Sequence, residues 1–171
     1  MDLRKNQKGF TLIEMIVVLI IIAILAAAAI PTMMGYVTNA QNSTAVAEAR
    51  TVYTAAQVVV TKGVAMGLFA DAEASGVSGS GDSSAFPATP TSDNEVNYIS
   101  SSDVDKPAAK EIKDLAELKI DKDSAVSFCV AFDSVSGKVV AVSYTNKSGR
   151  KVVIENGGVA QYYDGKDWKI V

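Results

Sequence analysis

The longest apolar stretch of the sequence runs from Phe10 to Ile30. From Met15 onward this stretch contains no charged residue, no glycine and no proline. A helix rises about 1.5 Å per residue, so the whole stretch would be roughly 31 Å long. That length matches the hydrocarbon core of a bilayer. The pattern therefore predicts a membrane-spanning helix over residues 10–31.

Beyond Pro31 the apolar residues recur at intervals of three and four, which indicates one face of a helix. They are Val46, Ala49, Tyr53, Ala56 and Val60. We expect an amphipathic second half of the same helix, ending near Gly63 and Gly67. Pro31 removes a backbone donor and clashes with the carbonyl four residues earlier. A kink or local melting is therefore expected over residues 23–31.

Residues 71–102 are rich in serine, glycine, aspartate and threonine and show little periodicity. This composition predicts an exposed loop. Loops of this length are uncommon without a function. A contact with another chain and a plain solvated connection fit the sequence equally well.

A short helix is predicted over residues 103–119. Asp103 or Asp105 is expected to cap it, because aspartate accepts hydrogen bonds from the first free N–H groups of a helix. Pro107 then falls in the first turn, where its missing N–H costs nothing.

From Ser124 the apolar period changes from helical spacing to alternation, which predicts β-strands. Glycine-containing turns separate the strands at short intervals, as in antiparallel hairpins. We expect about four strands within residues 124–171, namely 126–132, 138–145, 151–155 and 159–163, with a short fifth over 168–171 that could close the chain. One face of this meander must pack on the long helix, since a lone sheet would leave its apolar side wet. The predicted fold class is α+β, with residues 32–171 as a globular head.

The composition narrows the functional classes. The chain has 171 residues, enough for one domain and an anchor, and a net charge of −3. Nucleic acids are recognised by basic surfaces, so no nucleic-acid partner is expected. Histidine is absent, which excludes histidine-dependent catalysis and metal sites. The sequence offers neither a phosphate-binding loop nor a nucleophile–base constellation, and we expect no catalytic residue, no enzymatic activity and no cofactor.

Cys129 is the only cysteine, so an internal disulfide is impossible. Apolar residues flank it in a predicted strand, which favours a buried thiol over an intermolecular disulfide. Two acidic clusters, residues 121–123 and 164–167, were weighed as calcium sites. Neither has the number and spacing of oxygen ligands that a calcium loop needs. We interpret both as ordinary turns and expect no metal.

Glu14 is out of place in the apolar stretch. A carboxylate inside a bilayer costs several kcal/mol, so it is by default a functional residue that needs a partner. The residues around it, KGFTLIE at 8–14, resemble the processing site of type IV prepilins, which carry a class III leader peptide. The resemblance implies a leader at residues 1–9, cleavage by a prepilin peptidase between Gly9 and Phe10, and N-methylation of Phe10.

Cleavage would create the α-amine of Phe10, a cation near neutral pH and one helical turn from Glu14. The resemblance implies that this amine pairs with the glutamate of a neighbouring subunit, which makes Glu14 the residue of subunit assembly. Pairing within one chain, favoured by the helix N-terminus, stays open.

The resemblance implies the function as well. The protein would be a structural subunit of a type IV pilus, a helical filament of identical subunits that supports adhesion, motility or biofilm formation. Its further partners would be the assembly platform and ATPase. Before assembly the helix would span the cell membrane, with the basic head in the cytoplasm; afterwards the subunit would lie in the surface pilus. Pilins of Gram-negative bacteria often contain a C-terminal disulfide, so this chain is more similar to major pilins of Gram-positive anaerobes such as clostridia.

Other interpretations remain. A minor pilin, or a pseudopilin of a type II secretion or competence apparatus, would share the same anchor. From another class, an ordinary signal peptide cleaved near residues 26–29 would release a soluble binding domain. Glu14 argues against this last reading, as does the Gly9–Phe10 pair ahead of the apolar stretch. The N-terminus of the mature protein distinguishes the two routes.

Overall fold

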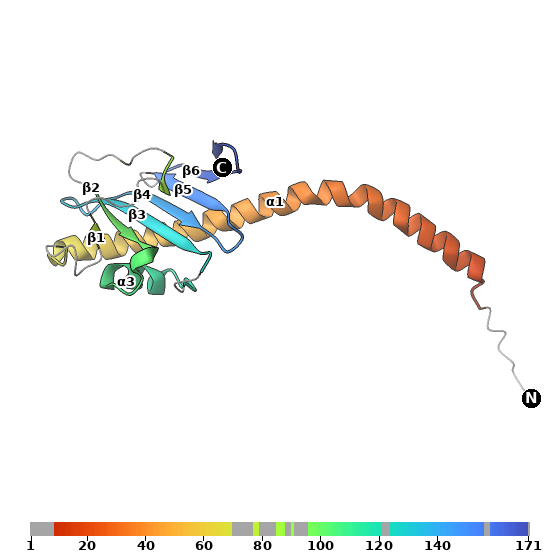
Figure 1. The fold of residues 1–171 in the computed structure, drawn as a ribbon, viewed down its shortest axis with the longest axis horizontal. Helices are drawn as coiled ribbons and strands as arrows, with labels where there is room; N and C mark the ends of the chain where they lie inside the picture. The colour runs from red at the N-terminus through yellow and green to blue at the C-terminus, as the bar shows by residue number, and fades with distance from the viewer. Residues whose placement is uncertain are drawn as a thin grey trace, which may run out of the picture. The chain divides into compact units, whose positions relative to one another are not determined.

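The computed structural model describes residues 9–69, 77–78, 85–87, 90, 96–120, 124–155 and 158–170. The chain divides into two compact units, Met1–Ala40 and Gln41–Val171, and each is described by itself. One helix, α1 (Leu12–Ala65), contributes its first part to the first unit and its second part to the second (Figure 1).

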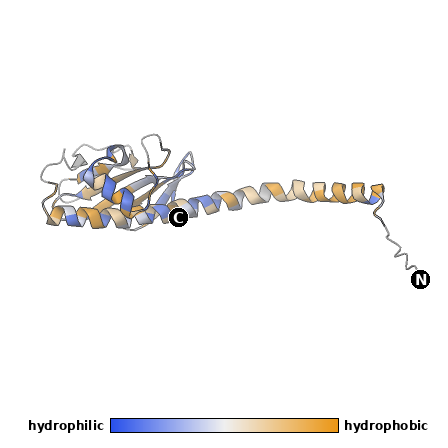
Figure 2. Ribbon diagram, turned by 90° about the horizontal axis from the view of Figure 1, so that it is seen from below, coloured by the Kyte–Doolittle hydropathy of each residue, from blue (hydrophilic) through white to orange (hydrophobic). Residues whose placement is uncertain are grey.

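In the first unit, every side chain described between residues 9 and 30 is exposed in the single chain. The segment Leu12–Ile30 has a mean hydropathy of 3.0 and is long enough to cross a membrane. Figure 2 shows this part of α1 mainly in the orange of apolar residues. The membrane-helix prediction is therefore met in length and composition.

The local melting expected over residues 23–31 is wrong, because α1 continues through Pro31 without a break. The proline removes a single backbone donor. The residues before it, AILAAAAI, are mostly alanine, the strongest helix former, and they hold the helix together. A bend of the axis at Pro31 stays a prediction.

The end of α1 agrees with the sequence. Gly67 has a φ of +66°, a left-handed conformation that glycine adopts without strain. Its N–H donates to Val64 O at 3.1 Å, and the N–H of Leu68 donates to Gly63 O at 2.9 Å. This pair of bonds is the Schellman motif that commonly ends helices.

The second unit contains a seven-stranded antiparallel sheet in the order β1-β2-β3-β4-β5-β6-β7. The strands are β1 (Val77–Ser78), β2 (Val96–Ser100), β3 (Ser127–Asp133), β4 (Val139–Thr145), β5 (Lys151–Glu155), β6 (Ala160–Tyr163) and β7 (Trp168–Ile170). The meander after residue 124 is confirmed, including its short last strand.

The sheet has seven strands, more than the expected four and short fifth, and the expectation of a loop throughout residues 71–102 was wrong. Strands β1 and β2 lie inside that segment, and β2 pairs along its length with β3. The sequence VNYIS is too short and too polar in its surroundings to indicate a strand by itself. The neighbouring edge of β3 supplies the hydrogen bonds that make it one.

The predicted helix over residues 103–119 is also shorter than expected. It consists of a 3₁₀ turn, η2 (Ser101–Asp103), followed by α3 (Pro107–Leu115). The N-cap of α3 is Lys106 rather than Asp103 or Asp105, because Asp103 already belongs to the 3₁₀ turn. Pro107 occupies the first helical position, as predicted.

The sheet is covered on both faces. On one face, apolar residues of β3, β4 and β5 pack with the buried stripe of α1 and with α3 in the main core. On the other face, a smaller cluster gathers Phe86, Tyr98, Cys129, Ala131, Ala141 and Val153. The residues of β3 that point to either face are therefore buried, apart from Ser127 at its start. Cys129 is buried, as predicted.

Candidate functional site

The N-terminus of α1 is organised by two side chains. Thr11 precedes the first helical residue, and Glu14 lies three positions later. The N–H of Thr11 donates to Glu14 Oε2 at 2.8 Å, and its hydroxyl donates to the same oxygen at 2.7 Å. In return, the N–H of Glu14 donates to Thr11 Oγ1 at 3.3 Å. These reciprocal bonds form a capping box, which satisfies N–H groups that the helix itself leaves without acceptors.

The capping box gives Glu14 a partner within its own chain. In the uncut chain the nitrogen of Phe10 belongs to a peptide bond and carries no charge, so the carboxylate depends on Thr11 and on the positive end of the helix dipole. Glu14 was recognised as a functional residue from the sequence, and Thr11 was missed. The signal was present, because threonine followed three residues later by glutamate is typical of a helix N-terminus.

The predicted cleavage residues lie just before this box. Phe10 is 79% exposed, and no heavy atom lies within 4 Å of the position where a side chain on Gly9 would begin. Within the described residues, the Gly9–Phe10 bond is therefore open to approach. Pro31, the remaining predicted residue, lies farther along α1 and takes no part in the arrangement.

Glu14 is the only charged residue between Gly9 and Ala47. Around it, large apolar side chains point outward on all sides of the helix, and half or more of the surface of most of them is exposed. A helix that is apolar all round belongs in a membrane or in the core of an assembly. The site thus consists of one carboxylate, Glu14, which is hydrogen-bonded to Thr11 at the start of an otherwise apolar helical segment.

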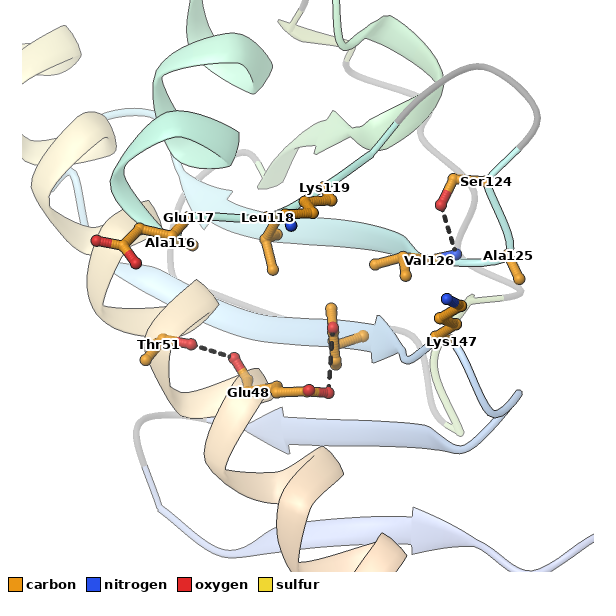
Figure 3. Close-up of a pocket in the computed structure, with 11 residues that line it drawn as sticks. Glu48, Thr51, Ala116, Glu117, Leu118, Lys119, Ser124, Ala125, Val126 and Lys147 are labelled. Carbon is orange, nitrogen blue, oxygen red and sulfur yellow. Dashed lines mark hydrogen bonds between the residues drawn. The ribbon is translucent and has the colours of Figure 1, made fainter.

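The head contains no competing catalytic arrangement among its described residues. A hollow of about 820 Å³ lies between α1, β4 and residues 116–119 and 124–126 (Figure 3). There the Tyr144 hydroxyl donates to Glu48 Oε2 at 3.3 Å, and burial together with that carboxylate raises the pKa of Tyr144. The Ser124 hydroxyl accepts the N–H of Val126. Among the described residues that line this hollow, no serine hydroxyl is hydrogen-bonded to a general base.

The acidic segment 164–167 forms a turn. Asp164 Oδ1 accepts the N–H groups of Lys166 and Asp167, each at 2.9 Å, and Oδ2 lies 2.5 Å from Lys169 Nζ. These interactions lower the pKa of Asp164 and raise that of Lys169. The carboxylate is thus engaged within the protein. The other segment weighed for calcium, residues 121–123, lies outside the described residues.

Comparison with known proteins bears on the same end of the chain. Residues 4–30 match the family model of the prokaryotic N-terminal methylation motif. The chain is 48% identical over 59 residues to two proteins of Pseudomonas aeruginosa named fimbrial protein. It is 43% identical over 61 residues to the type IV major fimbrial protein FimA of Dichelobacter nodosus.

These similarities cover part of each protein. The alignment with the Pseudomonas proteins spans 34% of this chain and 38% of the relative, and the alignment with FimA spans 36% and 39%. None of the solved structures matches the chain. The sequence similarity to these relatives therefore covers about a third of the chain, and the match to the family model covers residues 4–30.

Proposed function

We propose that the protein is a structural subunit of a type IV pilus. One observation carries the proposal: the residues that match the methylation motif include the apolar segment Leu12–Ile30 of α1, which has no buried residue in the single chain. Relatives named as fimbrial proteins, one of them a type IV major fimbrial protein, support a major subunit over a minor pilin or a pseudopilin.

The exposed apolar residues of Leu12–Ile30 are expected to be buried against a membrane or another helix. Burying a leucine, isoleucine or valine side chain contributes about 1.5–3 kcal/mol, so an exposed helix of such residues forgoes tens of kcal/mol. The bilayer covers the segment before assembly. In the filament, copies of the same helix cover one another and form the core. The exposed surface thus serves both states without any change in the head.

Glu14 sets the register of that core. In the membrane, the capping box with Thr11 reduces the cost of the carboxylate. In the filament, the α-amine of Phe10 from a neighbouring subunit pairs with it. An unpaired buried charge is strongly destabilising and a paired one is tolerated, so only one stagger of adjacent helices is acceptable.

Processing precedes assembly. A prepilin peptidase removes residues 1–9 by cutting between Gly9 and Phe10, and Phe10 is N-methylated. The subunit waits in the membrane with its basic end in the cytoplasm and is extracted by the assembly platform and its ATPase. On the cell surface the filament supports adhesion, motility or biofilm formation. The single cysteine supports a kinship with pilins of Gram-positive anaerobes.

The intact mass and N-terminal sequence of the mature protein test the processing step. We expect a chain that starts at Phe10 and carries one additional methyl group. A start within residues 26–30 would remove Glu14 together with most of the helix, and the pilus proposal would then be abandoned.

Two substitutions test assembly. Glu14→Val is expected to be processed and held in the membrane but to yield few filaments in sheared fractions. Glu14→Gln keeps an acceptor for the Thr11 hydroxyl and loses the charge, so it separates capping from charge pairing. If Glu14→Gln assembles like the unaltered protein, charge pairing is not the assembly determinant.

A further inference from the structure

A second hollow of about 210 Å³ lies on the face of the sheet opposite α1. Its floor is built from Ser127 and Cys129 of β3 and from Ser143 and Thr145 of β4, with Lys151 of β5 at one side. The register brings them together, because Ser127 pairs with Thr145 and Thr145 pairs with Lys151. Since alternate residues of a strand point to the same face, these side chains share one surface.

The hollow is lined by hydroxyl groups. Ser143 is only 4% exposed and lies among the lining residues. Ser127 and Thr145 lie near it on the same face and line the hollow too. A hydroxyl can both donate and accept a hydrogen bond, so this surface can donate to the oxygen atoms of a ligand.

Two further hydroxyls belong to residues that line the hollow. Ser101 Oγ accepts the N–H of Phe128 at 3.1 Å, and Ser100 Oγ accepts the N–H of Ser102 at 3.3 Å and the hydroxyl of Ser102 at 3.0 Å. A serine hydroxyl has one proton to donate besides its acceptor lone pairs. Since both oxygens act as acceptors in these bonds, the protons of Ser100 and Ser101 can be donated to an acceptor in the hollow.

The hollow carries a positive charge, supplied by Lys151. Lys151 is the only charged residue among the described residues that line the hollow, and none of them is a carboxylate. Its Nζ lies 5.8 Å from the ring centroid of Trp168, a cation–π distance that holds the ammonium near the hollow. Several hydroxyl donors around one cation match an anionic oxygen group better than a neutral or cationic ligand.

We propose that this hollow binds a small oxyanion, a carboxylate or a phosphate group, between the Lys151 ammonium and the hydroxyls of Ser127, Ser143 and Thr145. The volume is sufficient. Liquid water occupies about 30 Å³ per molecule, so the hollow has room for roughly seven waters or for one such group with part of its hydration. The site lies in the head and does not depend on the proposed role of α1.

The natural probe is Trp168, the only tryptophan of the chain. An anion that draws the Lys151 ammonium toward the hydroxyls changes the cation–π contact and hence the fluorescence of the ring. We expect a saturable fluorescence change when inorganic phosphate is added to the full chain in detergent micelles at constant ionic strength, and no change with chloride. Titration calorimetry on the same samples measures binding without relying on the tryptophan.

Matched variants locate the site. Lys151→Met is expected to weaken phosphate binding by about tenfold or more, and Ser143→Ala by a smaller factor, since charge-assisted bonds are the stronger ones. Lys151→Arg keeps the charge and should retain binding. The control is Lys147→Met, which removes the same charge from an exposed position in the neighbouring turn. Equal weakening by Lys147→Met and Lys151→Met, or no saturable binding by calorimetry, would overturn the proposal.

The source of the oxyanion is resolved by comparing ligands. Inorganic phosphate, glycerol 3-phosphate and acetate present the same chemistry as a free ion, as a phosphate ester of the kind found in surface polymers, and as a carboxylate. Tighter binding of glycerol 3-phosphate than of inorganic phosphate points to an ester carried by a larger molecule. The reverse order points to a free ion, and a preference for acetate assigns the site to carboxylates.

Discussion

Gln57 connects α1 to the turn between β3 and β4 by both ends of its amide. Its Nε2 donates to Gly137 O at 2.9 Å, and its Oε1 accepts the N–H of Val139 at 3.0 Å. The amide thereby makes the two hydrogen bonds, one donated and one accepted, that the backbone of a neighbouring strand would make at the start of β4. Replacing it by leucine keeps the approximate size and removes both bonds.

The cost of Gln57→Leu follows from what is left behind. Val139 is completely buried, so its N–H loses its acceptor without access to water, at about 1–3 kcal/mol. Gly137 O keeps a second, longer bond from Thr61 Oγ1 at 3.4 Å and loses the shorter one, at about 0.5–1.5 kcal/mol. The free energy of unfolding should fall by about 2–4 kcal/mol, a large share of the roughly 5–15 kcal/mol typical of a domain.

Urea unfolding of the full chain in detergent micelles, followed by Trp168 fluorescence, measures this loss. With a slope of about 2 kcal/mol per molar, the midpoint should fall by roughly 1–2 M while the slope stays the same. Gln41→Leu is the control, because the Gln41 side chain accepts a long bond of 3.4 Å from Arg150, and its loss should cost less than about 1 kcal/mol. Equal midpoints for the two variants would refute the argument that the buried N–H of Val139 carries the cost.

Two further predictions concern backbone positions in the same unfolding assay. A Cβ on Gly63 would lie 2.2 Å from the ring of Phe69, so Gly63→Ala should destabilise the head by about 1–2 kcal/mol, although this change usually stabilises a helix. Gly35→Ala, where nothing lies within 4 Å of the added Cβ, should not lower the midpoint. Glu117 ends α3 with a φ of +53°, a strained value for a residue with a side chain. Glu117→Gly should therefore raise stability by about 1 kcal/mol, and Glu117→Ala should not; a gain in both would attribute the effect to the charge instead.

The elements that the sequence predicted well are those with a local signal. The helix α1 was evident from an apolar stretch followed by a stripe at helical spacing, and its end was evident from Gly67. The strands β3 to β7 were evident from alternation interrupted by glycine-containing turns. In each case the residues that decide the structure lie within a few positions of one another.

The elements that the sequence missed depend on distant partners. Strand β2 exists because β3 offers it hydrogen bonds, and the two are separated by more than twenty residues. Phe86 lies among polar residues and gave no sign that it covers the outer face of the sheet, where its ring lies 6.4 Å from that of Tyr98. Pairing across such distances is a property of the whole chain.

The candidate sites divide in the same way. By itself, the sequence determined the apolar rod, its single carboxylate and the processing motif, because these follow from the order of neighbouring residues. The tertiary structure alone decided that Ser143 is buried and that it lines the same hollow as Lys151. The register of three strands sets which hydroxyls meet, and register arises from packing and hydrogen bonds between segments that the sequence keeps apart.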